Sequence, residues 1–237
     1  MKKKVIQIAA RQSLPITCSY LFVSMAYGIV MEEAGFAWFW SLFTSLTVYT
    51  GAFQFVLVTF LSSGASIVTV ALTALFMNSR QVFYGLSFIE DFRNMGKKYP
   101  YMIHTMTDET YAVNCALTEK KELFESEEER RNVMLYVALF SRISWMFGAV
   151  LGGVLGQVLP MELEGIDFCM TALFVVIFID QWKVAKHHVP ALLGLGAGIL
   201  SLLIFGAGNF ILPALILVSG LLLLLEKKIQ KEETECE

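Results

Sequence analysis

The stretch that decides the fold is Ala37 to Leu61, AWFWSLFTSLTVYTGAFQFVLVTFL, which contains no charged side chain. A helix needs about 20 apolar residues to cross a bilayer core about 30 Å thick, so this stretch is long enough. Other uncharged runs are 13–31, 168–179, 189–206 and 210–225. Two more apolar runs, 67–89 and 133–156, are each interrupted by one arginine. A soluble domain could bury one such helix but not five or more. The pattern therefore predicts an all-α polytopic membrane protein.

Composition supports this class and excludes others. Of the 237 residues, 56% are hydrophobic and only 16% are charged, whereas about a quarter of a soluble protein is charged. The 18 basic and 21 acidic residues give a net charge of -3, without the broad basic field of a nucleic-acid-binding protein. The four cysteines lie far apart and lack the spacing of a metal or redox site. We therefore expect no metal, no cofactor and no nucleic acid as a partner.

The basic residues predict the orientation in the bilayer. Positive charges at 2–4 and Arg11 precede the first apolar run, and Glu32 and Glu33 follow it without a signal-peptidase site. The positive-inside rule places the basic end in the cytoplasm. The basic clusters at 183–188 and 227–231 are assigned there too, and the acidic loop 162–167 outside. We expect a multi-pass cell-membrane protein with both termini cytoplasmic and an even number of crossings.

The number of crossings is six to eight, with at least one broken or re-entrant helix. If 67–89 doubles back as a re-entrant hairpin, the chain crosses six times and Lys97 lies inside. If 67–89 spans the bilayer and 99–118 returns, it crosses eight times and Lys97 lies outside. We favour eight, because 99–118 is mostly apolar and brings the basic residues of 119–132 back to the cytoplasm.

The charged segments divide the chain. Residues 1–225 are expected to form one integral membrane transport domain, and 226–237 a charged cytoplasmic tail. The segment 119–132, EKKELFESEEERRN, places opposite charges such as Glu127 and Arg131 at helical spacing, which predicts a solvated cytoplasmic connector helix. A weak internal repeat aligns Gly35 with Gly165, each just after an acidic segment; a true duplication and a chance match are equal alternatives.

Polar residues inside apolar runs are the default candidates for a site, because an unpaired polar side chain in hydrocarbon is costly. The first cluster is Tyr49-Thr50-Gly51-Ala52-Phe53-Gln54-Phe55, in the middle of the second apolar run. Two small residues beside an amide allow a local unwinding that could bind an amino acid. The alternative is a packing notch in which Gln54 bonds to a neighbouring helix.

The second cluster is Asn78, Arg80 and Gln81. These residues follow the apolar run 67–77, which is too short to span a bilayer, so they lie within the membrane region. They are therefore the second group of candidate site residues. The alternative is that Arg80 snorkels to the membrane surface.

The third cluster is Thr107-Asp108-Glu109-Thr110 together with His104. On a continuous helix Asp108 lies one turn after His104, so the two could share a proton. Carboxylates that alternate between buried and hydrated states can couple proton movement to transport. A solvated loop is the alternative for this segment.

Other conspicuous residues are assigned structural roles. Arg142 and Asp180 are expected at the cytoplasmic interface. Glycines at 148, 152 and 156, and again at 194 and 198, recur at every fourth position, which indicates helix-packing stripes. The chain lacks the P-loop, zinc-protease and nucleophile-elbow motifs, so we do not expect an enzyme.

The order of the motifs resembles the large subunit of bacterial branched-chain amino acid exporters, the AzlC-like permease family. Four pieces carry the resemblance: Ser13-Leu14-Pro15-Ile16 opening the first helix, Tyr49 to Phe55, Asn78-Ser79-Arg80 with Tyr84-Gly85-Leu86-Ser87, and Thr107 to Ala112. Together they cover roughly residues 13–208. Gln81 and Phe53 depart from the family pattern, in which a histidine and a small residue are expected.

The resemblance implies proton-driven efflux of leucine, isoleucine, valine and methionine or analogues, with a second small membrane subunit of about three helices. Arg80 with Asn78 would take the carboxylate, Gln54 and carbonyls at the break near Tyr49 and Gly51 the ammonium, and phenylalanines the side chain. Asp108, Glu109 and His104 would carry the proton. The alternatives are a transporter or channel for another small polar solute and a membrane-embedded enzyme.

Overall fold

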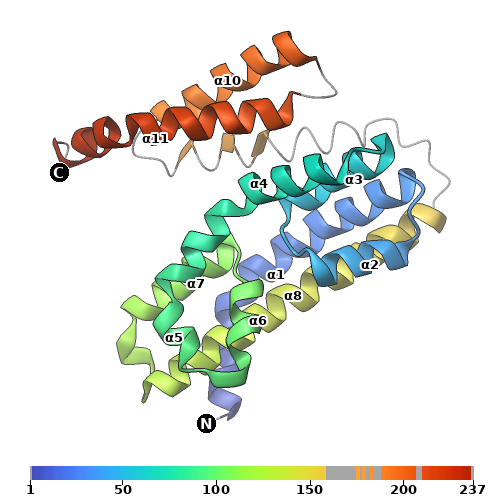
Figure 1. The fold of residues 1–237 in the computed structure, drawn as a ribbon. Helices are drawn as coiled ribbons and strands as arrows, with labels where there is room; N and C mark the ends of the chain where they lie inside the picture. The colour runs from blue at the N-terminus through green and yellow to red at the C-terminus, as the bar shows by residue number, and fades with distance from the viewer. Residues whose placement is uncertain are drawn as a thin grey trace. The chain divides into compact units, whose positions relative to one another are not determined.

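The structure is a computed structural model of residues 1–237. It describes residues 2–158, 188–206 and 210–235, and between them residues 175–176, 178–179 and 182–183. The described residues are helical or irregular, with no strand among them (Figure 1). Two helices within this part, α1 (Lys2–Glu33) and α8 (Glu127–Val158), are long and apolar enough to cross a membrane, and shorter apolar helices accompany them. The predicted helical membrane protein is confirmed at this level.

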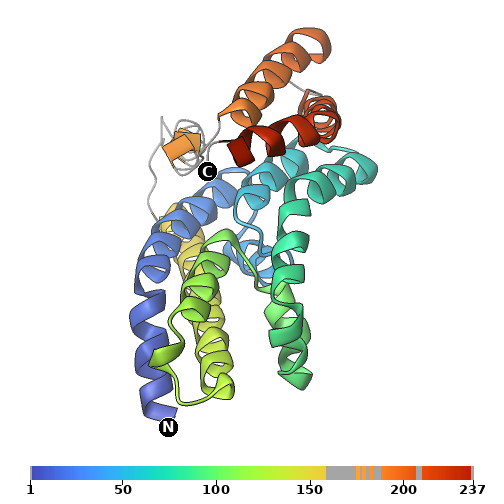
Figure 2. The same cartoon turned by 90° about the vertical axis from the view of Figure 1, so that its left-hand side faces the viewer.

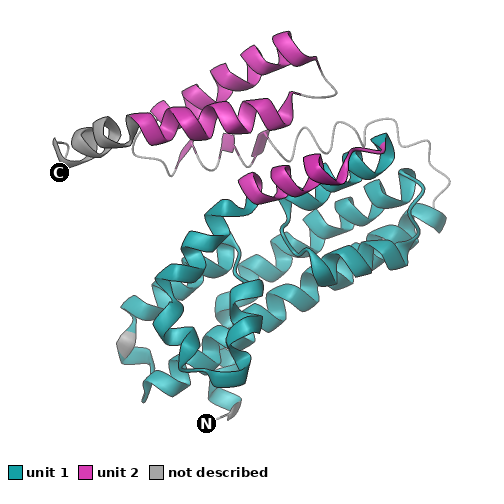
Figure 3. Cartoon of the chain, in the orientation of Figure 1, with its two compact units in different colours: residues 1–63, 78–164 teal, residues 64–77, 165–237 magenta. Residues whose placement is uncertain are grey.

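The chain divides into two compact units, shown in Figure 3. Unit 1 holds residues 1–63 and 78–164, and unit 2 holds residues 64–77 and 165–237. Each is described by itself, and the single membrane domain expected over 1–225 stays a prediction.

Unit 1 is built on the pair α1 and α8, which run parallel to each other. Lys4 Nζ donates to Glu125 Oε1 at 2.8 Å just before α8 begins, and at the other end Gln157 Nε2 donates to Glu32 Oε2 at 3.1 Å. Small residues let the two backbones approach. A Cβ on Gly152 would overlap the Met25 carbonyl oxygen. The predicted packing stripe on α8 is therefore confirmed.

The start of α1 lies with the charged connector at one end of unit 1. A hydrogen bond from Lys4 lowers the pKa of Glu125. Nearby, the buried guanidinium of Arg130 donates to Asp91 Oδ1 at 2.6 Å and to Thr118 Oγ1 at 2.8 Å. The sequence analysis assigned residues 2–4 and 119–132 to the same side of the membrane, and the structure brings them together.

The connector is not one helix, in contrast to the prediction. α7 (Asp108–Glu119) ends before it, a 3-10 turn η2 (Lys121–Leu123) follows, and α8 begins at Glu127. The Glu129 N–H donates to Ser126 Oγ at 3.2 Å, and the Glu129 carboxylate accepts the Glu125 N–H at 2.8 Å. This S-x-x-E arrangement caps a helix start, so the chain turns where a continuous helix was expected. Glu127 pairs with Arg130, three residues further along α8.

The decisive run 37–61 forms a hairpin of two short helices, α2 (Trp38–Thr47) and α3 (Ala52–Ser63). α2 starts beside the end of α8, where Trp38 packs against Gly153. It descends until the Leu46 carbonyl meets Arg142 in the middle of α8. α3 then returns along α1, with Phe55 stacked edge-on against Tyr27 at 5.5 Å (Figure 1). A run long enough to span therefore enters and leaves at one end.

A second hairpin enters unit 1 from the opposite end. α5 (Ile89–Arg93) and the turn η1 (Gly96–Lys98) lie near the start of α8, where Lys98 Nζ donates to Asn132 Oδ1 at 3.3 Å. α6 (Tyr99–His104) then rises to the level of Arg142, and α7 descends beside α1 and α8 until Thr118 reaches Arg130 (Figure 2).

These hairpins correct the predicted topology. Residues 67–87 form one continuous helix, α4 (Ile67–Ser87), so the segment does not double back as the six-crossing alternative required. Segment 99–118 does double back, which contradicts its return across the bilayer in the favoured eight-crossing alternative. Lys97 lies at the same end as 119–132, whereas eight crossings placed the two on opposite sides. The run that doubles back is therefore 99–118 and not 67–89.

One further prediction, on the start of the first helix, is wrong, and others fall outside the described residues. Pro15 lies inside α1 and does not open it, because the helix already begins at Lys2; membrane helices tolerate an internal proline. Asp180, Gly165 and the acidic loop 162–167 lie outside the described residues, so the interface role of Asp180 and the repeat stay predictions.

Unit 2 contains the beginning of α4 and the adjacent apolar helices α10 (Val189–Phe205) and α11 (Ile211–Glu235). Within the described residues, nothing lies within 4 Å of a Cβ built on Gly194 or Gly198. The predicted packing stripe on α10 therefore has no close neighbour among the described residues, in contrast to the stripe on α8, and stays a prediction.

The two stripes predict opposite responses to the same substitution. Gly152→Ala should destabilise the protein by about 1–3 kcal/mol, because the methyl group overlaps a backbone carbonyl. Gly198→Ala meets open space and should be neutral or slightly stabilising, since alanine favours a helix over glycine. Thermal unfolding in detergent measures both. Equal melting temperatures for the two variants would contradict the close α1–α8 packing.

Candidate functional site

The tip of the first hairpin is an unwound segment between α2 and α3. Tyr49 and Gly51 have φ angles of +44° and +42°, a region that glycine enters freely and tyrosine rarely. α2 therefore stops at Thr47 although the run stays apolar. The predicted local unwinding at Tyr49 and Gly51 is confirmed.

Gln54 holds the two arms of this hairpin together. Its side chain is fully buried, and Nε2 donates to Ser45 Oγ on α2 at 3.3 Å. Next to it, the Tyr27 and Thr44 hydroxyls share a hydrogen bond of 2.6 Å. This geometry corresponds to the packing alternative for Gln54.

The tip of the second hairpin is the break at residues 105–107 between α6 and α7. The Thr107 side chain caps α7 by accepting the Thr110 N–H, and the Thr110 hydroxyl accepts the Thr107 N–H at 2.8 Å. This reciprocal cap begins a new helix at Asp108. His104 and Asp108 therefore do not share one helix, which contradicts the geometry on which their predicted proton sharing was based.

Tyr20 of α1 connects the second tip to the first. Its buried hydroxyl donates to Glu109 Oε2 at 2.6 Å and shares a hydrogen bond of 2.7 Å with Thr107 Oγ1. The ring packs edge-on against Trp145 at 5.1 Å, in one cluster with Tyr49. Glu109 is thus held by a tyrosine at the meeting of the two tips.

Arg142 connects both hairpins to α8. Its Nη2 donates to the Leu46 carbonyl oxygen at 2.5 Å. Its guanidinium lies 5.5 Å from the Tyr49 ring centroid and 5.4 Å from that of Tyr101 on α6, distances at which a cation is attracted by an aromatic face. The sequence analysis assigned Arg142 to the membrane interface. The one available signal was an arginine inside the otherwise apolar run 133–156.

Arg80 and Asp108, assigned from sequence to separate clusters, are bonded to each other. Arg80 Nη2 on α4 lies 2.5 Å from Asp108 Oδ2 at the start of α7. The Arg80 side chain is 49% exposed and that of Asp108 is 32% exposed, so both remain accessible. Tyr84, one turn after Arg80, lies beside Asp108 and stacks on Tyr111 at 4.4 Å between ring centroids. The pair therefore presents both charge signs next to an aromatic wall.

The structure does not bring all predicted residues together. Asn78 and Arg80 are separated by one residue on a continuous helix, so they point to different faces. His104 is exposed at the end of α6 and lies near Arg142. The described residues contain no group of three or more His, Cys, Asp or Glu side chains that could hold a metal.

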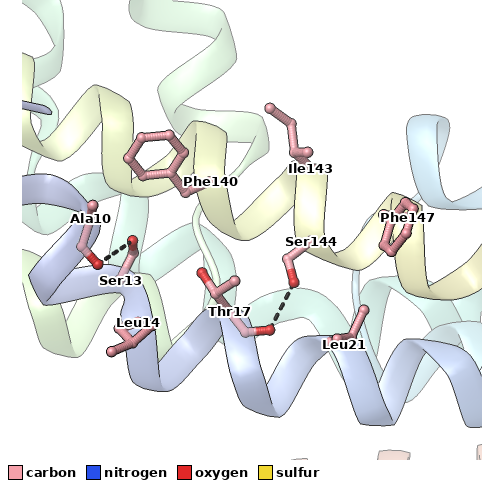
Figure 4. Close-up of a pocket in the computed structure, with 9 residues that line it drawn as sticks. All are labelled: Ala10, Ser13, Leu14, Thr17, Leu21, Phe140, Ile143, Ser144 and Phe147. Carbon is pink, nitrogen blue, oxygen red and sulfur yellow. Dashed lines mark hydrogen bonds between the residues drawn. The ribbon is translucent and has the colours of Figure 1, made fainter.

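Two cavities lie in unit 1. One of about 400 Å³ follows the α1–α8 seam (Figure 4) and contains none of the predicted site residues. Its serine and threonine atoms are partly engaged, since Ser144 Oγ donates to the Thr17 carbonyl oxygen at 2.7 Å. The other, of about 350 Å³, lies between the end of α4 and α7 and shares Tyr111 with the aromatic wall beside Arg80 and Asp108. The second cavity is therefore the one closer to the ion pair.

Removing Arg142 should loosen the first tip. Arg142→Gln loses both ring contacts and the positive charge on the Leu46 carbonyl, so the break should open more often. In a cysteine-free background, we expect a cysteine at Thr50, whose hydroxyl is buried, to react with maleimide several-fold faster. A cysteine at Ser62, already exposed on α3, is the matched control. Unchanged labelling at position 50 would contradict this role.

Comparison with known proteins identifies the family. The model of the AzlC protein family matches residues 15–159. The "Branched-chain amino acid transport protein AzlC" of Bacillus subtilis is 36% identical over 93% of this chain and 85% of its own length. An uncharacterized membrane protein of Haemophilus influenzae is 37% identical over 95% and 89%, and the "Inner membrane protein YgaZ" of Escherichia coli is 33% identical over 80% and 79%.

No solved structure matches the chain. The family model begins at Pro15 within α1 and extends beyond the end of α8, so it includes both hairpins and the Arg80–Asp108 pair. The chain belongs to the AzlC family.

Proposed function

We propose that this protein is a secondary transporter that exports branched-chain amino acids, namely leucine, isoleucine, valine and methionine or analogues, driven by the proton gradient. It works in the cell membrane with both termini in the cytoplasm and with a small second membrane subunit of about three helices. The name of the Bacillus subtilis relative supports amino-acid transport. That name does not include export, proton coupling or the partner subunit, which we add to the proposal.

The observation that carries the proposal is the meeting of two broken hairpins that enter from opposite ends. Transporters commonly place the substrate where broken helices of opposite orientation meet, because backbone groups are unsatisfied there and each side can open in turn. Here a helix followed by a broken hairpin occurs twice, as α1 with α2–α3 and as α4 with α6–α7. Tyr20 bonds to Thr107 at the second tip and packs in one cluster with Tyr49 at the first. Arg142 lies over the rings of Tyr49 and Tyr101, one from each hairpin.

The side chains around the two tips suit a zwitterionic substrate with an apolar side chain. Arg80 offers a fork of N–H donors for a carboxylate. An ammonium has two sets of acceptors near the tips, the backbone carbonyls of the unwound segment at Tyr49 and Gly51 and the carboxylate of Asp108. Asp108 and Glu109 are the carboxylates available for the proton. An ion channel is less well supported, because paired charges bind a zwitterion in preference to passing ions in bulk.

Transport is tested by leucine counterflow. In proteoliposomes that contain the full chain and the partner subunit, labelled leucine should enter vesicles preloaded with unlabelled leucine and saturate with concentration. Flux that does not saturate and shows no exchange would indicate a channel. No flux with any branched-chain amino acid would contradict the proposed substrate class.

A substitution separates substrate binding from snorkelling at Arg80. Arg80→Lys keeps the charge but loses the planar fork, so leucine affinity should fall about tenfold or more, the value of a lost charge-assisted hydrogen bond. Arg93→Lys, at an exposed arginine of α5, is the matched control and should bind normally. Normal binding by Arg80→Lys would support the snorkelling alternative.

A further inference from the structure

We infer that Asp108 is the ligand of the substrate ammonium as well as the proton carrier, so that leucine and the coupling proton compete for one carboxylate. The inference rests on the proposed function and gives it a coupling mechanism. The starting observation is the Arg80–Asp108 bond, which joins two clusters that the sequence assigned to separate tasks.

Both partners of this bond have free capacity for a ligand. Arg80 carries five N–H donors and Asp108 about four acceptor positions, and the ion pair joins one nitrogen to one oxygen. Both side chains are between about a third and a half exposed, and Asp108 Oδ1 is a buried acceptor without a hydrogen-bond partner among the described residues. An amino acid can therefore dock alongside the pair, with its carboxylate on Arg80 and its ammonium on Asp108.

Charge balance decides which protonation state binds leucine. With Asp108 ionised, the pair is neutral and complementary to a zwitterion. With Asp108 protonated, Arg80 is unbalanced and the substrate ammonium would face a cation without an anion, which is unfavourable in a medium of low dielectric. Leucine therefore binds ionised Asp108, and when a proton arrives on the carboxylate the ammonium leaves.

Other titratable groups in the described part of the chain lie close to Asp108, and the carboxylate among them is already bonded to a tyrosine. Tyr84 on α4 lies against the Asp108 carboxylate, and Glu109 is its neighbour on α7. Glu109 accepts the hydrogen bond of Tyr20. Mutually exclusive binding of proton and substrate to one group is the condition for exchange transport. It makes an inward proton gradient drive outward amino-acid movement.

The sign of the pH dependence distinguishes this mechanism from its rival. If the substrate carboxylate merely displaced Asp108 from Arg80, the freed Asp108 would bind protons more tightly, and leucine affinity would rise as the pH falls. If Asp108 holds the ammonium, leucine affinity must fall as the pH falls, by up to about tenfold per pH unit below the Asp108 pKa.

A ligand that lacks the ammonium provides an internal control. 4-Methylpentanoate has the leucine side chain and carboxylate only, so it should bind better when Asp108 is protonated and Arg80 is released. Its affinity should therefore rise over the range in which that of leucine falls.

The experiment measures the affinity of the full chain in lipid nanodiscs for both ligands from about pH 8 down to about pH 4.5, toward the ordinary aspartate pKa of about 4. For the wild type, we expect opposite pH slopes for leucine and 4-methylpentanoate. Asp108→Asn should weaken leucine binding about tenfold or more, remove both slopes, and bind 4-methylpentanoate more tightly than the wild type near pH 8. This gain of binding cannot come from misfolding.

Glu125→Gln, which removes an exposed ion pair with Lys4, is the matched control and should keep both wild-type slopes. Leucine affinity that rises at low pH, or slopes that persist in Asp108→Asn, would overturn the inference while leaving transport intact. A wild-type protein that neither binds nor exchanges leucine would instead overturn the proposed function.

Discussion

The proposed transport mechanism depends on the ion pair between Arg80 and Asp108. An arginine or aspartate in the membrane interior is costly unless it is paired or faces water. Here each charge meets the other at 2.5 Å, and both stay partly exposed. The pair connects α4 to the start of α7, and so to the tip of the second hairpin. A substrate that engages either charge therefore acts directly on the hairpin tip.

The two hairpins create a need for polar partners inside unit 1, in a chain that has few charges. Each apolar run that doubles back ends inside the protein and leaves backbone groups that need partners. Arg142 supplies a donor to the Leu46 carbonyl at the first tip, and the Thr107–Thr110 cap satisfies N–H groups at the second. The close parallel packing of α1 and α8 forms the frame that presents Tyr20 and Arg142 to both tips.

Part of this architecture could be predicted from sequence. The apolar runs indicated the helical membrane class, and the glycine spacing indicated the packing stripe of α8. The two small residues Gly51 and Ala52 near Gln54 indicated a possible break. Hydropathy cannot show whether a run as long as 37–61 crosses the bilayer or returns, because both arrangements bury the same apolar side chains. The S-x-x-E signal at Ser126 and the threonine cap at Thr107 were local signs of helix starts within segments interpreted as continuous.

The site could be predicted only as separate pieces. Arg80 and Asp108 lie in different segments of the sequence, and nothing in their local sequence shows that they meet. Arg142 is predicted at the interface because the residues that follow it, 143–159, are still about long enough for a span. Its role depends on two aromatic rings and a carbonyl that come from three other elements, α2, α6 and the break between α2 and α3.

An experimental structure of the full chain with bound leucine, determined near pH 8, would show which groups hold the substrate. We expect the leucine carboxylate on the Arg80 guanidinium and the ammonium nitrogen about 3 Å from the Asp108 carboxylate. Leucine bound elsewhere, with the Arg80–Asp108 bond unchanged and no contact to Asp108, would contradict it.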